Sequence, residues 1–335
     1  MVTTVAINGF GRIGRLVLRA IAESGREDLQ VVAVNDLTDV ETNAHLFRYD
    51  SVHGRFGGEV ATGADWMDVG QGPIKVTALR NPEELPWGDV DIALECTGLF
   101  TKTREGSAKH LENGSKRVLA SAPCKGADIT AVMGVNHQDV KSEHLVISNA
   151  SCTTNCLAPA AKVLDDLVGI EKGFMTTVHS YTGDQPTLDR GHSDLYRARA
   201  AAMSMIPTST GAAKAVGLVL PDLLGKLDGV AIRVPTPNVS CVDLTFTAKR
   251  ATSAEELNEA FIAAAASGPL KGILGVTDRK LVSVDLNHDA HSSTIALDQT
   301  RVMDGTLCRV LAWYDNEWGF SNRMADMAAT IAKTL

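Results

Sequence analysis

The stretch that decides the fold is VAINGFGRIG, at residues 5–14 of the 335-residue chain. A short apolar run, typical of a buried strand, leads into three glycines, and apolar residues at helical spacing follow as far as Ser24. Gly9 permits a tight turn, Gly11 lets the backbone approach a pyrophosphate, and Gly14 lets the helix pack against the strand. The stretch therefore predicts a strand, a phosphate-binding turn and a helix, in that order.

A second apolar run, at residues 29–35, supports this interpretation because it ends at an acidic residue, Asp36. Asp36 lies about 20 positions after Gly14, as in dinucleotide-binding folds. A carboxylate there accepts hydrogen bonds from the adenosine ribose and repels a 2′-phosphate, which favours NAD over NADP. The alternative, three turn glycines with no ligand, accounts less well for the strand, the helix and the acidic residue together.

The chain changes character near residue 150. Before it, predicted strands alternate with helices, which indicates a parallel sheet, and after it longer apolar runs predict a mixed or antiparallel sheet. The predicted strands are residues 90–95, 117–121, 145–148, 174–179, 230–234, 239–248, 294–297 and 306–314. We expect an α/β protein with a Rossmann-type parallel-sheet domain over residues 1–150, completed by a C-terminal helix at 316–335. An α+β catalytic domain is expected over residues 151–315.

Composition disfavours several classes of function as the main activity. The formal net charge is −8 and aromatic residues make up 5% of the chain, so nucleic acids and membrane surfaces are poor candidates as primary partners. No apolar run approaches the ~18 residues of a transmembrane helix, and the N-terminus lacks a signal-peptide pattern. The six cysteines have no disulfide-framework or zinc-site spacing. We expect a cytoplasmic protein with reduced thiols and no bound metal.

One cysteine differs from the others because small polar residues surround it. Cys152 lies within SCTTN at residues 151–155, between a predicted strand and a helix predicted at 156–167. The positive end of a helix dipole favours the thiolate, which is the nucleophilic form of cysteine. Nearby backbone amides and threonine hydroxyls can hold an oxyanion or a phosphate. The other cysteines are expected to be buried and inert: Cys96, Cys124, Cys156, Cys241 and Cys308.

A cysteine nucleophile needs a base, and His179 is the best placed of the nine histidines. It ends a predicted strand, and ligands of open α/β sheets bind at such strand ends. Two others, His288 and His291, flank Asp289 and are expected to form a structural hydrogen bond. The remaining histidines lie among charged residues and are expected to meet solvent: His45, His53, His110, His137, His144 and His192.

Cationic and hydroxyl residues in the second half of the chain predict a phosphate site. They are Arg197, Arg199, Arg233, Thr182, Thr208, Thr210 and Gly211. The run at residues 208–214 is typical of a helix start, and such starts bind anions. Arg233 lies in an apolar predicted strand, where a charge must be paired or bind a ligand. An internal pair with Asp184 or Asp243 is the alternative.

Together these motifs resemble those of phosphorylating glyceraldehyde-3-phosphate dehydrogenases of the NAD-dependent, bacterial type. The resemblance runs from Val5 to the end of the chain. Six stretches carry it: NGFGRIGR (8–15), SNASCTTNCLAP (148–159), HSYTGDQ (179–185), STGAAKAVG (209–217), GVAIRVPTPNVS (229–240) and WYDNEWGFSNR (313–323).

The resemblance implies a role for each site residue. Cys152 attacks the aldehyde of a sugar phosphate to form a thiohemiacetal, and His179 takes the hydroxyl proton as hydride leaves for NAD. Inorganic phosphate then attacks the resulting thioester. Residues implied in binding phosphate groups are Ser151, Thr153, Thr182, Arg197, Thr210, Gly211 and Arg233, with Asp184 assisting. Residues implied in binding NAD are Gly9, Gly11, Arg12, Ile13, Gly14, Asp36, Arg80, Ser121 and Asn316.

The resemblance also implies a homotetramer, in which the polar loop at residues 181–206 packs against a neighbouring subunit's cofactor. Leu37 agrees with NAD, whereas Arg190 and Gly191 replace the Leu-Pro of NAD-specific relatives and leave use of NADP open. Two other functions are possible. An erythrose-4-phosphate dehydrogenase hydrolyses its thioester, and the complete set of phosphate-site residues disfavours it. A non-catalytic protein that binds nucleotides or RNA has no need of Cys152 with His179.

Overall fold

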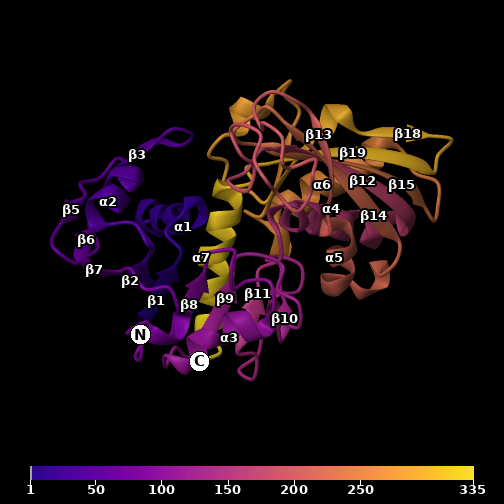
Figure 1. Cartoon of the computed structure of the whole chain (residues 1–335). Coiled ribbons are helices and arrows are strands. Elements are labelled where there is room, and N and C mark those ends of the chain that lie inside the picture. Colours follow the sequence, from indigo (N-terminus) through magenta and orange to yellow (C-terminus); the bar gives the residue numbers. More distant parts are fainter. Residues whose placement is uncertain (1) are drawn as a thin grey trace. The chain divides into compact units, whose positions relative to one another are not determined.

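The computed structural model describes residues 2–335 (Figure 1). Contacts between residues divide the chain into two compact units. Unit 1 consists of the residues up to 131, residues 137–151 and residues 321–335, and unit 2 of residues 132–136 and 152–320. Each unit is built around its own sheet.

The described residues of unit 1 form a nine-stranded sheet in the order β10-β11-β9-β8-β1-β2-β7-β6-β5. The strands from β10 to β7 run parallel, and β6 and β5 continue the sheet antiparallel at one edge. Their bounds are β1 Thr3–Asn8, β2 Leu29–Asn35, β5 Ala61–Thr62, β6 Trp66–Asp68, β7 Pro73–Thr77, β8 Ile92–Glu95, β9 Arg117–Ala120, β10 Ile129–Thr130 and β11 Val146–Ser148. The parallel sheet predicted from alternating strands and helices is confirmed.

The helices of unit 1 are α1 (Arg12–Glu23), α2 (Val40–Arg48), α3 (Arg104–Glu112) and residues 321–332 of α7 (Trp318–Ala332). A two-residue pair, β3 (Tyr49–Asp50) and β4 (Gly54–Arg55), follows α2. Helix α1 buries the apolar positions that its sequence repeats at helical spacing, among them Leu16, Val17 and Ile21. Burial of this stripe fixes the helix that follows the glycine turn.

The glycine turn between β1 and α1 requires glycine at two positions for different reasons. Gly9 has φ +90°, a left-handed conformation that costs other residues strain. A Cβ on Gly14 would lie 2.1 Å from the Gly9 carbonyl oxygen, so helix and turn touch without a side chain between them. By contrast, nothing lies within 4 Å of a Cβ built on Gly11.

We expect Gly14→Ala to destabilise unit 1 by about 3 kcal/mol, because the new methyl group must displace backbone. Gly11→Ala, in the same turn but facing open space, is the matched control, with an expected loss within about 1 kcal/mol. Urea unfolding followed by circular dichroism measures both variants. Equal midpoints for the two would contradict the packing argument.

Unit 2 is built on an eight-stranded mixed sheet in the order β13-β14-β12-β15-β19-β17-β16, with β18 paired to β19. The long strand β12 pairs in parallel with β14 and antiparallel with β15, as the predicted mixed sheet requires. The bounds are β12 Ile170–Ser180, β13 Ile206–Ser209, β14 Leu227–Val234, β15 Ser240–Ala248, β16 Leu274–Thr277, β17 Ser293–Ala296, β18 Arg301–Met303 and β19 Leu307–Tyr314.

Three helices accompany this sheet: α4 (Cys152–Val168), α5 (Ala212–Val219) and α6 (Ala254–Ala266). Helix α4 packs on β17 and β19, and α5 packs on β14. The residues of β12 that face these helices, such as Met175, are buried, whereas Phe174 and Val230 on the opposite face are exposed. Among residues 2–335, no helix therefore covers the face of this sheet that carries Phe174 and Val230.

Two predicted helix starts differ from the structure. Helix α4 begins at Cys152, four residues before the predicted start, so the thiol belongs to its first turn. Helix α7 begins at Trp318 instead of residue 316, because the Asp315 carboxylate accepts the backbone N–H groups of Glu317 and Trp318 at 2.9 and 2.7 Å. Among residues 2–335, no helix has the length and apolar character needed to cross a membrane.

Candidate active site

The thiol of Cys152 and the imidazole of His179 meet in unit 2. The Sγ atom lies 3.6 Å from Nε2 of the ring. Cys152 is the first residue of α4, and His179 is the last residue but one of β12. His179 is buried and Cys152 is half-buried. A helix start and a strand end thus bring together the two residues that the sequence predicts as nucleophile and base.

Hydrogen bonding fixes which nitrogen of His179 faces the thiol as a proton acceptor. Nδ1 lies 2.7 Å from the carbonyl oxygen of Ser180, and because a carbonyl only accepts, Nδ1 carries the proton. In the neutral ring, Nε2 then presents its lone pair to the thiol of Cys152. The arrangement allows the thiol proton to pass to Nε2.

The electrostatics of the pair differ from what the helix start alone predicts. Burial raises the pKa of the Cys152 thiol, and the nearby charge of Arg233 opposes that rise. Burial, together with the Arg233 charge, lowers the pKa of His179 to about 3. At neutral pH the resting pair is therefore a thiol beside a neutral imidazole, and the thiolate forms by proton transfer within the pair.

Tyr314 joins the two elements that carry the pair. Its hydroxyl lies 2.9 Å from the hydroxyls of both Thr153, on α4, and Thr177, on β12. Its ring meets the His179 ring edge-on, with centroids 5.9 Å apart. Burial raises the pKa of Tyr314 well above its ordinary value, so the phenol stays protonated. No local sequence signal predicts a role for Tyr314, although it belongs to the stretch WYDNEWGFSNR at residues 313–323.

A cationic cluster lies next to His179. Arg233 stands opposite His179 in the β12–β14 register, and its Nη1 donates to the Ser180 carbonyl and to the Thr182 hydroxyl, both at 3.0 Å. Of the two carboxylates considered as partners of Arg233, Asp243 pairs instead with Arg309 at 2.7 Å.

The second carboxylate, Asp184, lies within the cluster. It accepts hydrogen bonds from the Thr182 hydroxyl and, at 3.0 Å, from Nη1 of Arg197. Nε of Arg197 also donates to the Thr208 hydroxyl at 3.0 Å. The Thr208 hydroxyl in turn donates to the Asp194 carboxylate at 2.6 Å. Two guanidinium groups and two threonine hydroxyls thus lie beside two carboxylates, and these cationic and hydroxyl donors are of the kind that bind a phosphate group.

The remaining predicted phosphate residues lie at the starts of two helices. Thr153 belongs to the first turn of α4, and Ser151 directly precedes Cys152. Gly211 caps α5, where the Thr210 hydroxyl accepts the N–H of Ala212 at 3.2 Å. Helix starts of this kind present backbone N–H groups to anions.

Unit 1 contains a cavity of about 300 Å³ at the carboxyl ends of its parallel strands. Its lining residues are Asn8, Gly9, Gly11, Asn35, Asp36, Leu37, Leu79, Arg80, Cys96, Thr97, Leu99 and Phe100. The Asp36 carboxylate accepts the N–H groups of Phe10 at 2.9 Å and Thr38 at 3.0 Å, which fixes it at the end of β2. This is the place where parallel α/β sheets bind nucleotides.

Comparison with known proteins identifies the family. Residues 3–103 match the family model described as "Glyceraldehyde 3-phosphate dehydrogenase, NAD binding domain", and residues 151–316 match "Glyceraldehyde 3-phosphate dehydrogenase, C-terminal domain". The chain belongs to the glyceraldehyde-3-phosphate dehydrogenase family.

Relatives in the family are similar over their whole length. The glyceraldehyde-3-phosphate dehydrogenase of Xanthobacter flavus is 72% identical over 335 residues, which cover 99% of each chain. That of Cereibacter sphaeroides is 70% identical over 100% of each chain, and that of Geobacillus stearothermophilus is 58% identical over 99% of each. The predicted family, fold class and NAD cofactor are confirmed.

The unit 1 cavity fits the NAD of the family's N-terminal domain. The open space in front of Gly11 leaves backbone accessible to a pyrophosphate, and Asp36 presents a carboxylate where a ribose binds. Of the predicted NAD residues, Gly9, Gly11, Asp36 and Arg80 line the cavity. The other predicted NAD residues are not among those that line the cavity. Arg12 pairs with Asp50 at 2.6 Å, and Ile13 and Gly14 lie in α1. Ser121 hydrogen-bonds Cys96, and Asn316 belongs to unit 2.

Some predictions about single residues are wrong. His110 does not meet solvent: it is fully buried, with Nε2 2.9 Å from a carboxylate oxygen of Glu95. His53 is buried as well, and Cys96, expected to be buried, is partly exposed at the cavity. The expected hydrogen bond between His291 and Asp289 is confirmed, at 2.7 Å. Asn8, Asn35 and Thr97 line the cavity but were not predicted.

Proposed function

We propose that this protein oxidises D-glyceraldehyde 3-phosphate with NAD and inorganic phosphate to 1,3-bisphosphoglycerate, a step of glycolysis and gluconeogenesis. The observation that carries the proposal is the Cys152–His179 pair, 3.6 Å apart, beside the cluster of Arg233, Arg197 and Thr182. A nucleophile with its base accounts for attack on an aldehyde, and the cations account for a substrate phosphate.

The proposed chemistry begins with proton transfer within the pair. Nε2 of His179 takes the thiol proton, and Sγ of Cys152 attacks the aldehyde carbon. Backbone amides in the first turn of α4 stabilise the developing oxyanion, and His179 returns the proton to give a thiohemiacetal. His179 then takes the hydroxyl proton again as the carbon loses hydride. NAD, when bound, supplies the acceptor for that hydride.

The second half-reaction releases the product from Cys152. Oxidation leaves a thioester on Sγ, and an oxygen of inorganic phosphate attacks its carbonyl carbon. The C–S bond breaks, the acyl phosphate departs, and the thiolate of Cys152 recovers the proton held by His179. The covalent thioester retains the free energy of oxidation until phosphate arrives.

Each remaining predicted site residue has a place in this proposal. Thr182 and Arg233 hold the substrate phosphate, with Arg197 near both phosphate groups. Inorganic phosphate binds at Ser151, Thr153, Thr210 and Gly211. NAD binds at Gly9, Gly11, Arg12, Ile13, Gly14, Asp36, Arg80, Ser121 and Asn316. The proposed cofactor domain is residues 1–150 with 316–335, and the proposed catalytic domain is residues 151–315.

Absorbance at 340 nm tests the proposal and its nearest alternative. We expect NADH formation from glyceraldehyde 3-phosphate that depends on inorganic phosphate, because the thioester needs phosphate as its acceptor. A faster, phosphate-independent rate with erythrose 4-phosphate would replace this proposal by a thioester-hydrolysing dehydrogenase. Parallel runs with NADP measure how strictly Asp36 and Leu37 exclude the 2′-phosphate.

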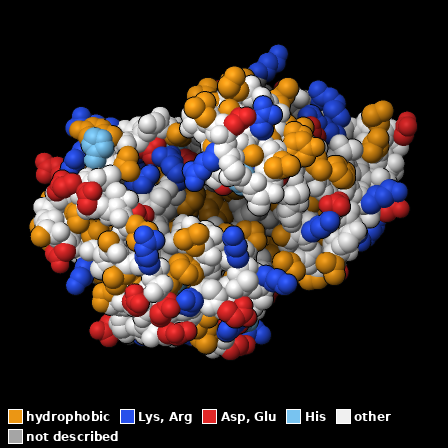
Figure 2. All heavy atoms as spheres, in the orientation of Figure 1, with side chains coloured by type: hydrophobic (Ala, Val, Ile, Leu, Met, Phe, Trp, Pro, Cys, Tyr) orange, Lys and Arg blue, Asp and Glu red, His pale blue; other side chains and the backbone are white. Residues whose placement is uncertain are grey.

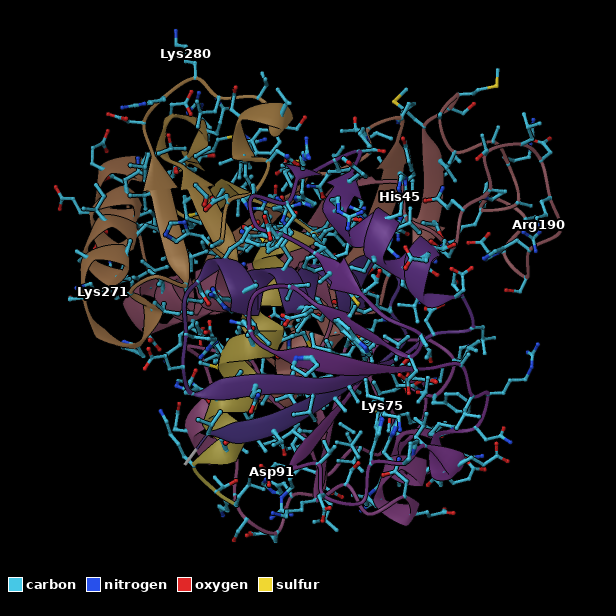
Figure 3. All side chains as sticks on the ribbon, turned by 90° about the vertical axis from the view of Figure 1, so that its left-hand side faces the viewer. His45, Lys75, Asp91, Arg190, Lys271 and Lys280 are labelled. Atoms are coloured by element: carbon cyan, nitrogen blue, oxygen red, sulfur yellow. The ribbon has the colours of Figure 1, made fainter. Side chains whose placement is uncertain are left out.

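We also propose a cytoplasmic homotetramer. Exposed Phe174 and Val230 on the helix-free face of the unit 2 sheet, and exposed Leu195 in the loop at residues 181–206, support burial against other copies. Arg190 projects from the surface in that loop (Figure 3). Light scattering should give about four times the 35.6 kDa chain mass.

A nucleic acid is not proposed as a primary partner. Basic and acidic side chains are interspersed over unit 1 on the face shown in Figure 2. Proteins that bind nucleic acids through phosphates gather their cations on one face instead.

A further inference from the structure

The carboxylate of Glu95 lies at the centre of a buried hydrogen-bond network at the end of β8. Glu95 is fully buried. It accepts hydrogen bonds from Nδ2 of Asn8 at 2.7 Å, from Nε2 of His110 at 2.9 Å, and from the backbone N–H of Thr97 at 2.8 Å. The Thr97 hydroxyl donates to it as well. Four donors compensate a charge that would otherwise be costly to bury.

His110 holds this carboxylate from the side away from the cavity. A carboxylate only accepts, so Nε2 of His110 is the donor. The His110 ring stacks on Trp87, with centroids 5.5 Å apart and an interplanar angle of 8°, which fixes its orientation. Trp87 and His110 are both buried. The position of Glu95 is therefore set in part by two buried residues that are not among the residues lining the cavity.

From Glu95 the network continues into one wall of the NAD cavity. Asn8, which donates to Glu95, accepts from Nδ2 of Asn35 at 2.8 Å through its own Oδ1. Oδ1 of Asn35 in turn accepts the N–H of Leu79 at 2.9 Å. Asn8, Asn35 and Leu79 all line the cavity.

The other branch holds a second part of the lining. The Thr97 hydroxyl, while donating to Glu95, accepts the N–H of Leu99 at 3.0 Å. Thr97 and Leu99 line the cavity, whereas neither Glu95 nor His110 is among its lining residues. One carboxylate thus connects two segments of lining that are far apart in the sequence.

We propose that Glu95 is a positioning residue for NAD, and that His110 acts through it. The carboxylate holds the Asn8–Asn35–Leu79 wall and the Thr97–Leu99 segment at the separation that the dinucleotide requires. The inference deepens the proposed function and rests on its assignment of NAD to this cavity.

Glu95→Gln is the sharpest variant, because glutamine has the same shape but one acceptor oxygen in place of two. Its NH₂ group must face either the donors of Asn8 and His110 or those of Thr97. One of the two branches then loses its anchor. We expect the affinity for NAD and for ADP-ribose to fall about tenfold, with kcat and the KM for the aldehyde changed less than about twofold.

Asp91→Asn is the matched control, because Asp91 directly precedes β8 and Glu95 ends it. Asp91 is labelled in Figure 3. It accepts from the N–H and hydroxyl of Thr4 at 2.8 and 2.9 Å, and from Lys116 at 2.7 Å. It has no place in the cavity lining. This variant should lose thermal stability while binding ADP-ribose like the unchanged protein.

Calorimetric titration of ADP-ribose into the full chain decides the matter. Weaker binding by Glu95→Gln, with Asp91→Asn unchanged, supports the inference. Unchanged binding by Glu95→Gln, or equal weakening by both variants, overturns it. ADP-ribose needs no turnover, so a protein that binds it but reduces no NAD would refute the proposed function and leave this comparison intact.

A second pair of variants serves if Glu95→Gln does not fold. His110→Gln keeps a donor for Glu95, and His110→Leu removes it. We expect ADP-ribose binding close to normal for His110→Gln and about fivefold weaker for His110→Leu. Equal affinity of the two variants would overturn the inference.

Discussion

Cys152→Ser is expected to lower kcat by roughly 10⁴-fold or more, because the substitution removes the nucleophile on which both half-reactions depend. A serine hydroxyl has a far higher pKa than a thiol, and neutral His179 is too weak a base to ionise it. The cavity of unit 1 that fits NAD contains no atom of residue 152, so NAD affinity should persist. The two readouts are NADH formation at 340 nm and calorimetric titration of NAD.

Cys156→Ser is the control for this variant, because Cys156 lies one turn further along the same helix. It is fully buried, and its thiol donates to the Ser293 hydroxyl at 3.6 Å, a bond that serine can replace. Burial raises the pKa of the Cys156 thiol far above its ordinary value, so it is no nucleophile at neutral pH. We expect kcat within about fivefold of normal. Turnover retained in Cys152→Ser would refute the mechanism.

Features that depend on neighbours in the sequence were predictable. The strand–glycine–helix unit follows from the positive φ of Gly9 and from the contact of Gly14 with the Gly9 carbonyl, which involve only nearby residues. Cys152 and His179 could be paired in advance because a helix start and a strand end each mark where a ligand binds. Such local signals predict the type of a secondary-structure element and its place in a sheet.

Features that depend on distant residues were not predictable in this way. Tyr314 contacts Thr153 across 161 positions of sequence, and no local pattern distinguishes it from a core tyrosine. The charged residues that flank His110 predict that it meets solvent. In the structure it is buried by contacts with Glu95 and Trp87, which belong to other segments of the chain. The helix dipole, which a sequence reveals, predicts a lowered pKa for the Cys152 thiol. The depth of burial, which a sequence does not reveal, raises that pKa instead.

His179→Asn should lower kcat about 10²- to 10³-fold, because asparagine has no atom where Nε2 takes the thiol proton. Its amide nitrogen reaches about as far as Nδ1 and can still donate to the Ser180 carbonyl, so the local fold is retained. Without Nε2, no side chain takes the thiol proton, so alkylation depends on thiolate formed by loss of that proton to water. The rate of Cys152 alkylation by iodoacetamide, followed against pH, should shift to higher pH.

His291→Asn provides the matched comparison. His291 pairs with Asp289 at 2.7 Å and takes no part in the hydrogen bond between Cys152 and His179. Its alkylation profile should coincide with that of the unchanged protein. Coincident profiles for His179→Asn as well would disprove the pairing of thiol and imidazole.

The thermal stability of His179→Asn should depend on pH less steeply than that of the unchanged protein. The pKa of His179 is about 3 in the folded protein against an ordinary value of 6.5, so between these values the unfolded chain binds a proton that the folded chain does not. The stabilising contribution of neutral His179 is therefore complete above pH 6.5 and is lost as the pH falls towards 3. His179→Asn lacks this contribution, so its Tm should fall less between pH 7 and pH 5 than that of the unchanged protein. Parallel decreases in Tm would mean that His179 binds its proton equally in the folded and unfolded chains. A smaller decrease in the unchanged protein than in His179→Asn would mean that the resting pair is an ion pair of thiolate and imidazolium.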